Sequence, residues 1–258
     1  MDIIIQGGIY RGTVETAKSY LKLDFVENVI ISTWVNEKIP DTIQDRILVI
    51  KSEKPEIVGN ITMNLQIVSS REGIKRSNSD IVAKTRSDQR ISLDSMAKIN
   101  AFFDKNKNSV SKRFIEGPGP QGPVCVLGIS SPYAFHPQDH LFWGFKTDVE
   151  KIFDIPLMPM ELHSYDWTTA YRFPIYLGAN YAARFDASIE NYLKNYKEYL
   201  SSTGEVTSKR AEALAVSKGI MDDIFKALPE IDMYWEKYNS GYWYKQYKSG
   251  GEYYGNGW

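Results

Sequence analysis

Three short apolar runs rich in β-branched residues lie in the first part of the sequence. They are DIIIQGG at 2–8, NVIISTW at 28–34 and RILVIKS at 46–52. Between the first two, TVETAKSYLKL at 13–23 places apolar residues at helical spacing. Strands separated by a helix of this length form a right-handed βαβ unit in a parallel sheet covered by helices. The sequence therefore predicts an α/β fold with a mainly parallel central sheet.

The alternation of strands and helices continues beyond this point. We expect a helix over 61–74 that is capped by Asn60, and this helix leads into a fourth strand in DIVAKTRSDQRI at 80–91. Another helix is expected over 93–106, and another strand in VCVLGISS at 124–131. These elements extend the predicted sheet.

The second half of the chain has a different character. EGPGPQGP at 116–123 is the clearest break in the chain, and helical patterns at 188–200 and 212–228 make the C-terminal part rich in helices. The last residues are heavily aromatic, with Gly, Ser and Lys between the aromatic side chains. We therefore divide the chain into three parts: 1–115, 116–232 and 233–258.

The charge balance and the cysteine content restrict the partners and the compartment. The chain has 258 residues, of which 31 are basic and 32 acidic, so it has no general attraction to nucleic acid or to an anionic membrane. Its one cysteine, Cys125, is expected to be a buried structural thiol in a reducing compartment. Neither a signal peptide nor a long apolar run is evident. We expect a cytoplasmic protein without a transmembrane segment, and peripheral membrane contact is left open.

A run of alternating charges, AKTRSDQRI at 83–91, follows the apolar start of the fourth strand. If the strand stays extended, Lys84, Arg86, Asp88 and Arg90 lie on one face, because side chains alternate with period two. The run is either a solvated strand end or a site for a phosphate-bearing ligand. Arginine offers a planar fork of donors for phosphate oxygens, and a carboxylate can hold a divalent cation.

The carboxyl ends of three predicted strands are expected to converge. They carry Gln6 to Gly8, Ser32 to Trp34, and the 86–90 run, and ligands of open α/β sheets bind outside such ends. Gly7 and Gly8 would let a ligand approach the backbone, although a structural turn explains them equally well. The first strand is not followed by G-x-G-x-x-G, and the chain has no P-loop motif. An anion site of another kind is therefore expected at this edge.

Two histidines and an aspartate lie close together in HPQDH at 136–140. If Pro137 opens a helix, His136 and His140 share a helix face and form a metal site with Asp139. In a second interpretation, Asp139 is a general base that takes a proton from a sugar hydroxyl. In a third, Asp139 caps a helix and the histidines make ordinary polar contacts. The sequence leaves the three alternatives open.

Aromatic residues are concentrated in two places. We expect Phe142 and Trp143 in HLFWGF to belong to the core. The aromatic tail could bind a partner, a glycan or a membrane interface through Tyr242, Trp243, Tyr244, Tyr253 and Tyr254.

Several of these segments, in the same order, resemble the WavE family of lipopolysaccharide and surface-polysaccharide glycosyltransferases. The likeness rests on IIIQGGIYRGTVETAKSYLKLDFVENVIISTW, NLQIVSSREGI, AKTRSDQRI and FHPQDHLFWGFKTDVEKIFDIP. In family terms these are a Q-G turn, an S-T-W strand, a helix with Gln before paired Ser residues, a K-x-R-[ST]-D strand and an H-x-x-D-x-x-x-x-G segment. The likeness covers roughly residues 1–155.

The resemblance implies a nucleotide-sugar-dependent glycosyltransferase with a GT-A-like single domain. In this view 1–115 is the nucleotide-sugar-binding half, 116–232 the acceptor-side half and 233–258 a C-terminal tail. The implied partners are a nucleotide-sugar donor and a glycan or glycolipid acceptor. The residues implied to bind the donor are Gly7, Gly8, Thr33, Lys84, Arg86 and Arg90.

The resemblance also implies roles for two carboxylates. Asp139 is the candidate catalytic base, and Asp88 is the candidate ligand of a divalent cation, Mn²⁺ or Mg²⁺. Many enzymes of this type carry an Asp-x-Asp motif at the fourth strand, whereas Asp88 is followed here by Gln89 and Arg90. Dependence on a metal is therefore left open. Two rival functions are a metal-dependent hydrolase built on His136, Asp139 and His140, and a non-catalytic glycan-binding protein.

Overall fold

The structure is a computed structural model. It describes residues 1–39, 43–58, 62–109, 111–114, 119–130, 133–159, 169–196, 208–236 and 243–247.

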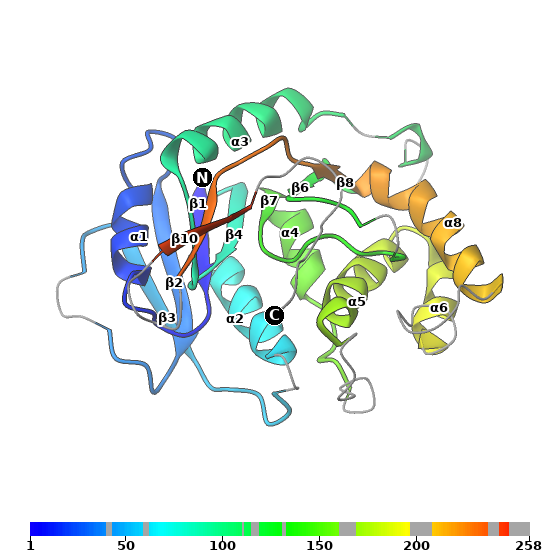
Figure 1. Cartoon of the computed structure of the whole chain (residues 1–258), viewed down its shortest axis with the longest axis horizontal. Helices are drawn as coiled ribbons and strands as arrows, with labels where there is room; N and C mark the ends of the chain where they lie inside the picture. The colour runs from blue at the N-terminus through cyan, green and yellow to red at the C-terminus, as the bar shows by residue number, and fades with distance from the viewer. Residues whose placement is uncertain are drawn as a thin grey trace.

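A seven-stranded sheet with the order β3-β2-β1-β4-β7-β6-β8 forms the centre of the molecule (Figure 1). Its strands are β1 Asp2–Gln6, β2 Asn28–Trp34, β3 Ile47–Ser52, β4 Ile81–Arg86, β6 Val124–Val126, β7 Phe142–Phe145 and β8 Phe225–Ala227. Neighbouring strands are parallel except on the two sides of β7, which is antiparallel to both β4 and β6. The prediction of an α/β fold with a mainly parallel sheet is confirmed.

Helices cover both faces of this sheet. They are α1 Thr13–Tyr20, α2 Met63–Arg76, α3 Leu93–Asn106, α4 Lys146–Phe153, α5 Thr169–Ala183, α6 Glu190–Lys194 and α8 Ser208–Ile224, with 3-10 turns η1 Lys112–Phe114 and η3 Ala187–Ile189. In Figure 1, α5, α6 and α8 gather at the opposite end of the molecule from α1. The helix-rich C-terminal part that the sequence predicts is therefore present.

Alternation along the strands produces two apolar cores. Ile3, Ile5 and Ala83 belong to the core that contains residues of α1 and α3, whereas Ile4 and Val82 belong to the core under α2, α4, α5 and α8. Because both faces are buried, the strands read as continuous apolar runs.

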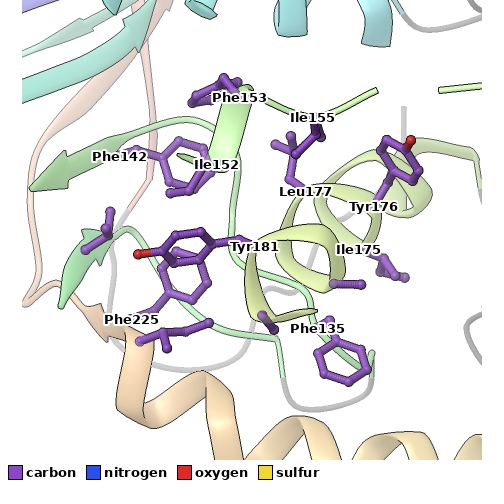
Figure 2. Packing of buried hydrophobic residues seen from close by; sticks show 14 of the residues in the cluster. Phe135, Phe142, Ile152, Phe153, Ile155, Ile175, Tyr176, Leu177, Tyr181 and Phe225 are labelled. Atoms are coloured by element: carbon purple, nitrogen blue, oxygen red, sulfur yellow. The ribbon is translucent and has the colours of Figure 1, made fainter. Parts of the chain in front are cut away.

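The second core is rich in aromatic side chains (Figure 2). Phe142 of β7 meets Phe153 of α4 edge to face, with ring centres 5.4 Å apart, and Tyr181 of α5 lies 5.4 Å from Phe225 of β8. These contacts join the C-terminal helices to the sheet. Phe142 and Trp143 are fully buried, as the sequence predicts.

A second, three-stranded sheet has the order β10-β9-β5 and is antiparallel. It comprises β5 Gln89–Ile91, β9 Met233–Glu236 and β10 Trp243–Tyr247. The start of the predicted tail therefore pairs with the segment that directly follows β4. Of the tail residues singled out above, Trp243 and Tyr244 lie in β10, and Tyr242, Tyr253 and Tyr254 lie outside the described ranges.

Several local predictions can be compared with the structure. The helix expected over 93–106 is confirmed and is capped by Ser92, whose side chain accepts a hydrogen bond from the Ser95 amide. The helix expected over 61–74 is α2, while its predicted cap, Asn60, lies outside the described residues. Cys125 is buried, and burial raises the pKa of its thiol to about 12, as fits a structural thiol. Within the described ranges, no helix has the length and apolar character to cross a membrane.

Candidate functional site

Backbone hydrogen bonds tie the ends of β1, β2 and β4 together around Gly7. The Gly7 amide donates to the Ser32 carbonyl at 3.0 Å, and the Ser87 amide donates to the Gln6 carbonyl at 2.9 Å. Gly7 has φ +124°, and a Cβ at this position would lie 2.6 Å from Ser87 Oγ. Glycine is therefore required here by backbone conformation and close packing, without reference to a ligand. The predicted convergence of the three strand ends is confirmed.

The hydroxyls next to this edge are buried on both faces of the sheet. Ser32 lies against Gly73 of α2, since a Cβ built on Gly73 would be 2.9 Å from Ser32 Cβ. Thr33, the next residue of the strand, points to the opposite face. Thr33 is fully buried, and its Oγ1 has no hydrogen-bond partner among the described residues. Its side chain is thus close to the predicted donor edge but enclosed by protein.

The charged run that follows β4 does not stay extended. β4 ends at Arg86, the chain turns through Ser87 and Asp88, and β5 begins at Gln89. The shared face is expected only for a strand that stays extended, and this condition is not met, because the turn breaks the period of two. Arg90 lies in β5 and is exposed, whereas Lys84 is fully buried.

Arg86 and Asp88 face each other across this turn. Arg86 Nε and Nη2 donate to the two carboxylate oxygens of Asp88 at 2.9 Å and 2.8 Å. Burial by itself raises the pKa of Asp88, but the guanidinium outweighs burial and the pKa lies below its ordinary value. The two residues form a bidentate, charge-assisted pair, which engages both oxygens of the predicted metal ligand.

The HPQDH segment is not helical. Pro137 forms an isolated bridge with Ile129, and the Gln138 amide donates to the Gly128 carbonyl at 2.9 Å. The alternative in which Pro137 opens a helix is therefore excluded, because this segment pairs with the chain that leaves β6.

The two histidines of this segment have different neighbours. The His136 ring lies 5.5 Å from the ring of Tyr133, whereas His140 Nδ1 lies 2.7 Å from Gln89 Nε2. Across the described ranges, no three His, Cys, Asp or Glu side chains are grouped to hold a metal ion. The helix-face zinc site of the hydrolase hypothesis therefore has no geometric support.

Asp139 reaches the end of β4 although it is distant in sequence. Its backbone carbonyl accepts a hydrogen bond from Lys84 Nζ at 2.8 Å. Burial by itself raises the pKa of the Asp139 carboxyl, but His140, Arg86 and Lys84 together lower it below its ordinary value. Asp139 is therefore ionised at neutral pH, beside the cations of the charged run. We name Lys84, Arg86, Asp88, Asp139 and His140 the charged cluster.

Lys84 lies inside the protein rather than on the donor edge. Its side chain has no exposed surface, and its ammonium lies 5.6 Å and 5.4 Å from the ring centres of Phe142 and Phe153. Burial lowers the pKa of Lys84 to about 7, and Asp139 opposes this effect. In this conformation the ammonium does not reach the surface, so the direct contact with a diphosphate predicted from the sequence would require the chain around Asp139 to move.

Trp235 of β9 packs against two members of the charged cluster, Arg86 and His140. No sequence motif points to this residue. Its ring centre lies 5.2 Å from Arg86 Cζ and 5.3 Å from the His140 ring centre. β9 brings it there by pairing with β5, in the register Gln89 to Trp235. The only sequence signal for this contact is the aromatic density of the C-terminal segment.

The polar side of α2 also faces the sheet. Ser69 Oγ donates to Gln6 Oε1 at 2.7 Å, and Asn64 binds both the amide and the carbonyl of Met158. The helix thus fixes the side chain at the end of β1 and the segment after α4.

Comparison with solved structures finds low similarity. HddC from Yersinia pseudotuberculosis has 13% identity and a TM-score of 0.36, with coverage of 60% of this chain and 79% of that chain. TarS from S. aureus in complex with UDP has 17% identity and a TM-score of 0.37, with coverage of 70% and 56%. The glycosyltransferase GlyE of Streptococcus pneumoniae TIGR4 has 13% identity and a TM-score of 0.35, with coverage of 86% and 50%. Scores this low support no argument about function.

Comparison at the level of sequence is more decisive. No curated protein matches the chain. A model of the family described as WavE lipopolysaccharide synthesis matches residues 3–224. The match includes every strand of the main sheet except β8 and extends well past the segments on which the resemblance rests. The chain therefore belongs to the WavE lipopolysaccharide synthesis family.

Proposed function

We propose that the protein is a GT-A-like glycosyltransferase that moves a sugar from a nucleotide-sugar donor to a hydroxyl of a glycan or glycolipid acceptor. Membership of a lipopolysaccharide synthesis family supports a reaction that builds glycan. The position of the charged cluster supports it as well, because ligands of open α/β sheets bind outside the carboxyl ends of the strands.

One observation carries most of the proposal. Asp139, from the segment between β6 and β7, is held at the end of β4 by the hydrogen bond from Lys84 to its carbonyl, and the charge of Arg86 helps to lower the pKa of its carboxyl. A glycosyl transfer with inversion needs a base for the acceptor hydroxyl and a positive group for the leaving diphosphate. The charged cluster offers one of each.

The proposed donor site is the edge formed by Gly7, Gly8, Arg86 and Arg90, and Thr33 contributes to it through its backbone because its side chain is buried. In the reaction, the Asp139 carboxylate takes the proton of the acceptor hydroxyl while that oxygen bonds to the anomeric carbon. The bond between the anomeric carbon and the diphosphate oxygen breaks, and its electron pair leaves with the nucleoside diphosphate. Negative charge grows on the leaving group, so a guanidinium directed at it lowers the barrier.

A divalent cation at Asp88 does not fit the hydrogen bonds that this carboxylate makes. Both Asp88 oxygens accept from Arg86, so a cation at this carboxylate would require the pair to open. Mg²⁺ commonly uses one or two protein carboxylates together with substrate phosphates, and such a cation would neutralise charge on the diphosphate. In the proposed reaction Arg86 therefore compensates the charge of the diphosphate.

Thermal shift with a panel of nucleoside diphosphates and nucleotide sugars, each with and without Mn²⁺ or Mg²⁺, tests the donor site. A ligand at 100 times its Kd stabilises the folded state by about 2.7 kcal/mol, so one nucleotide class should raise Tm clearly. Stabilisation that appears only with the cation, and that is lost in Asp88→Asn, would assign the metal to Asp88. A panel in which no nucleotide raises Tm would contradict the donor site.

The base assignment is tested with Asp139→Asn. We expect release of nucleoside diphosphate from the stabilising donor to fall about 100-fold or more, while the Tm rise with nucleotide persists. Asp104→Asn is the matched control, because Asp104 is an exposed partner of Lys107 on α3. Near-normal turnover in Asp139→Asn would remove the base role.

A further inference from the structure

We propose that Lys84 is a positioning residue that holds the Asp139 turn, residues 139 and 140, at the end of β4, and that it does not bind the donor diphosphate. The inference deepens the proposed function, because it concerns how the candidate base is held. The contact itself does not depend on any reaction.

Lys84 combines complete burial of its side chain with one identified hydrogen-bond acceptor. Lys84 has no exposed surface, and its Nζ donates to the Asp139 carbonyl at 2.8 Å. Removing an ammonium from water is unfavourable unless other groups replace the water. The carbonyl and the faces of Phe142 and Phe153 supply that replacement. The aliphatic part of the Lys84 side chain runs through the interior from β4 to the Asp139 turn.

The register of the sheet explains why the lysine reaches this carbonyl. Lys84 in β4 lies opposite Phe142 in β7, only three residues after Asp139. The antiparallel pairing therefore places the turn that precedes β7 beside the end of β4. A side chain with a long stem and a terminal donor can bind the carbonyl of that turn.

The Asp139 turn is held from two further directions. Gln89 of β5 hydrogen-bonds the His140 ring, and Trp235 of β9 packs against the same ring. These contacts fix the side chain of the second residue of the turn, whereas Lys84 fixes the backbone of the first. The position of the Asp139 turn at the end of β4 depends on both.

Four titratable groups interact with the charge of Lys84: Asp139, Arg86, Asp88 and, in the Asp139 turn, His140. Burial lowers the pKa of Lys84 to about 7 and that of His140 to about 4, while both carboxylates have lowered pKa values. Among these groups only Lys84 changes charge near neutral pH. Loss of its proton weakens a charge-assisted bond to a neutral one, and the acceptor peptide should report this change.

NMR of protein labelled with ¹⁵N-histidine tests the contact without any substrate. The chain has three histidines, and the His140 amide nitrogen belongs to the same peptide group as the Asp139 carbonyl. In the native protein we expect the His140 amide shift to change with an inflection near pH 7. In Lys84→Met the inflection should disappear and the resonance should move at all pH values.

Two further variants separate positioning from general loss of structure. Lys146→Met is the matched control, because Lys146 Nζ donates to the Ser77 carbonyl at 2.7 Å at the other end of the β4 and β7 pair. It should keep the His140 inflection. Lys84→Gln, a neutral donor, should give an amide shift close to the native high-pH value and no inflection. A His140 resonance unchanged in Lys84→Met would overturn the proposal.

The nucleotide panel adds a second, independent readout. If a nucleotide stabilises the native protein, Lys84→Met should keep most of that Tm rise, because Lys84 lies out of reach of the ligand. Complete loss of the Tm rise with an unchanged His140 resonance would mean that Lys84 contacts the diphosphate, against the proposal. Absence of any Tm rise in the native protein would count against the donor site alone, since the histidine readout needs no ligand.

Discussion

Arg86 and Asp88 form a bidentate pair across the turn that ends β4, with nitrogen–oxygen distances of 2.9 Å and 2.8 Å. The side chain of Arg86 is 23% exposed and that of Asp88 is 15% exposed. The pair spans the turn between β4 and β5, so the charged run is not one extended strand. It leaves the guanidinium stacked on Trp235, 5.2 Å from its ring centre.

The Arg86–Asp88 pair should contribute to stability in a pH-dependent way. Asp88→Asn is expected to lower the free energy of unfolding by about 1–3 kcal/mol at pH 7, because hydrogen bonds to a charged group are lost. The folded-state pKa of Asp88 is lowered, so its contribution is present above the unfolded pKa of about 3.9 and is lost as pH falls below that value. Urea denaturation of both proteins at pH 7 and pH 3 measures this, and the difference should shrink at pH 3. Equal differences at both pH values would contradict the ionic pair.

Gly7→Ala should destabilise the fold more than Gly8→Ala. At Gly7 an alanine combines φ +124° with a Cβ only 2.6 Å from Ser87 Oγ, and such strain costs of order 1–3 kcal/mol. At Gly8 the nearest atom is Glu37 Oε1 at 3.2 Å, the end of a flexible side chain. Urea denaturation of the two variants compares them directly. Similar losses in both would show that the Gly7 conformation is not the constraint.

Asn64→Ala should be strongly destabilising although Asn64 is polar. The side chain is fully buried and makes three hydrogen bonds, to the Ile57 carbonyl and to both the amide and the carbonyl of Met158. Its removal leaves buried backbone groups unsatisfied, so we expect a loss of about 2–4 kcal/mol in the free energy of unfolding.

Asn100→Ala is the control for this substitution, since Asn100 makes one exposed contact with Asp104 at 3.4 Å. It should change stability by no more than about 0.5 kcal/mol. Because alanine favours the helix more than asparagine does, helix propensity cannot cause a loss in either variant. A change of no more than about 0.5 kcal/mol in Asn64→Ala as well would show that the Met158 clamp does not stabilise the fold.

Stability should rise with pH between about 4.5 and 6.5. Burial lowers the pKa of His136 and of His140 to about 4, while an unfolded histidine titrates near 6.5. In this window the unfolded chain binds protons that the folded chain does not, so the free energy of unfolding rises by about 1.4 kcal/mol per pH unit for each such histidine. Denaturation across the window measures the slope. His140→Gln should remove about half of it, and a flat profile in the native protein would mean that the histidines are exposed to protonation.

Sequence patterns alone predict β1 to β4, β6, the helices α1 to α3 and the family. β-branched runs predict β1 to β4 because their periodicity and length are local properties, and the motif order from the Q-G turn to the HPQDH segment identifies the family. The residues at the carboxyl ends of β1, β2 and β4 were also predicted to converge, since parallel strands bring those ends to one edge.

The contacts that these residues make depend on the tertiary structure. The turn at Ser87 and Asp88 separates Lys84 from Arg90, and the antiparallel strand β7 brings the Asp139 carbonyl to Lys84. Trp235 reaches Arg86 through strand pairing between distant segments. Local sequence cannot specify such contacts, because burial and pairing partners depend on the whole chain. For the same reason, a lysine predicted to bind phosphate lies in the interior, bound to a backbone carbonyl.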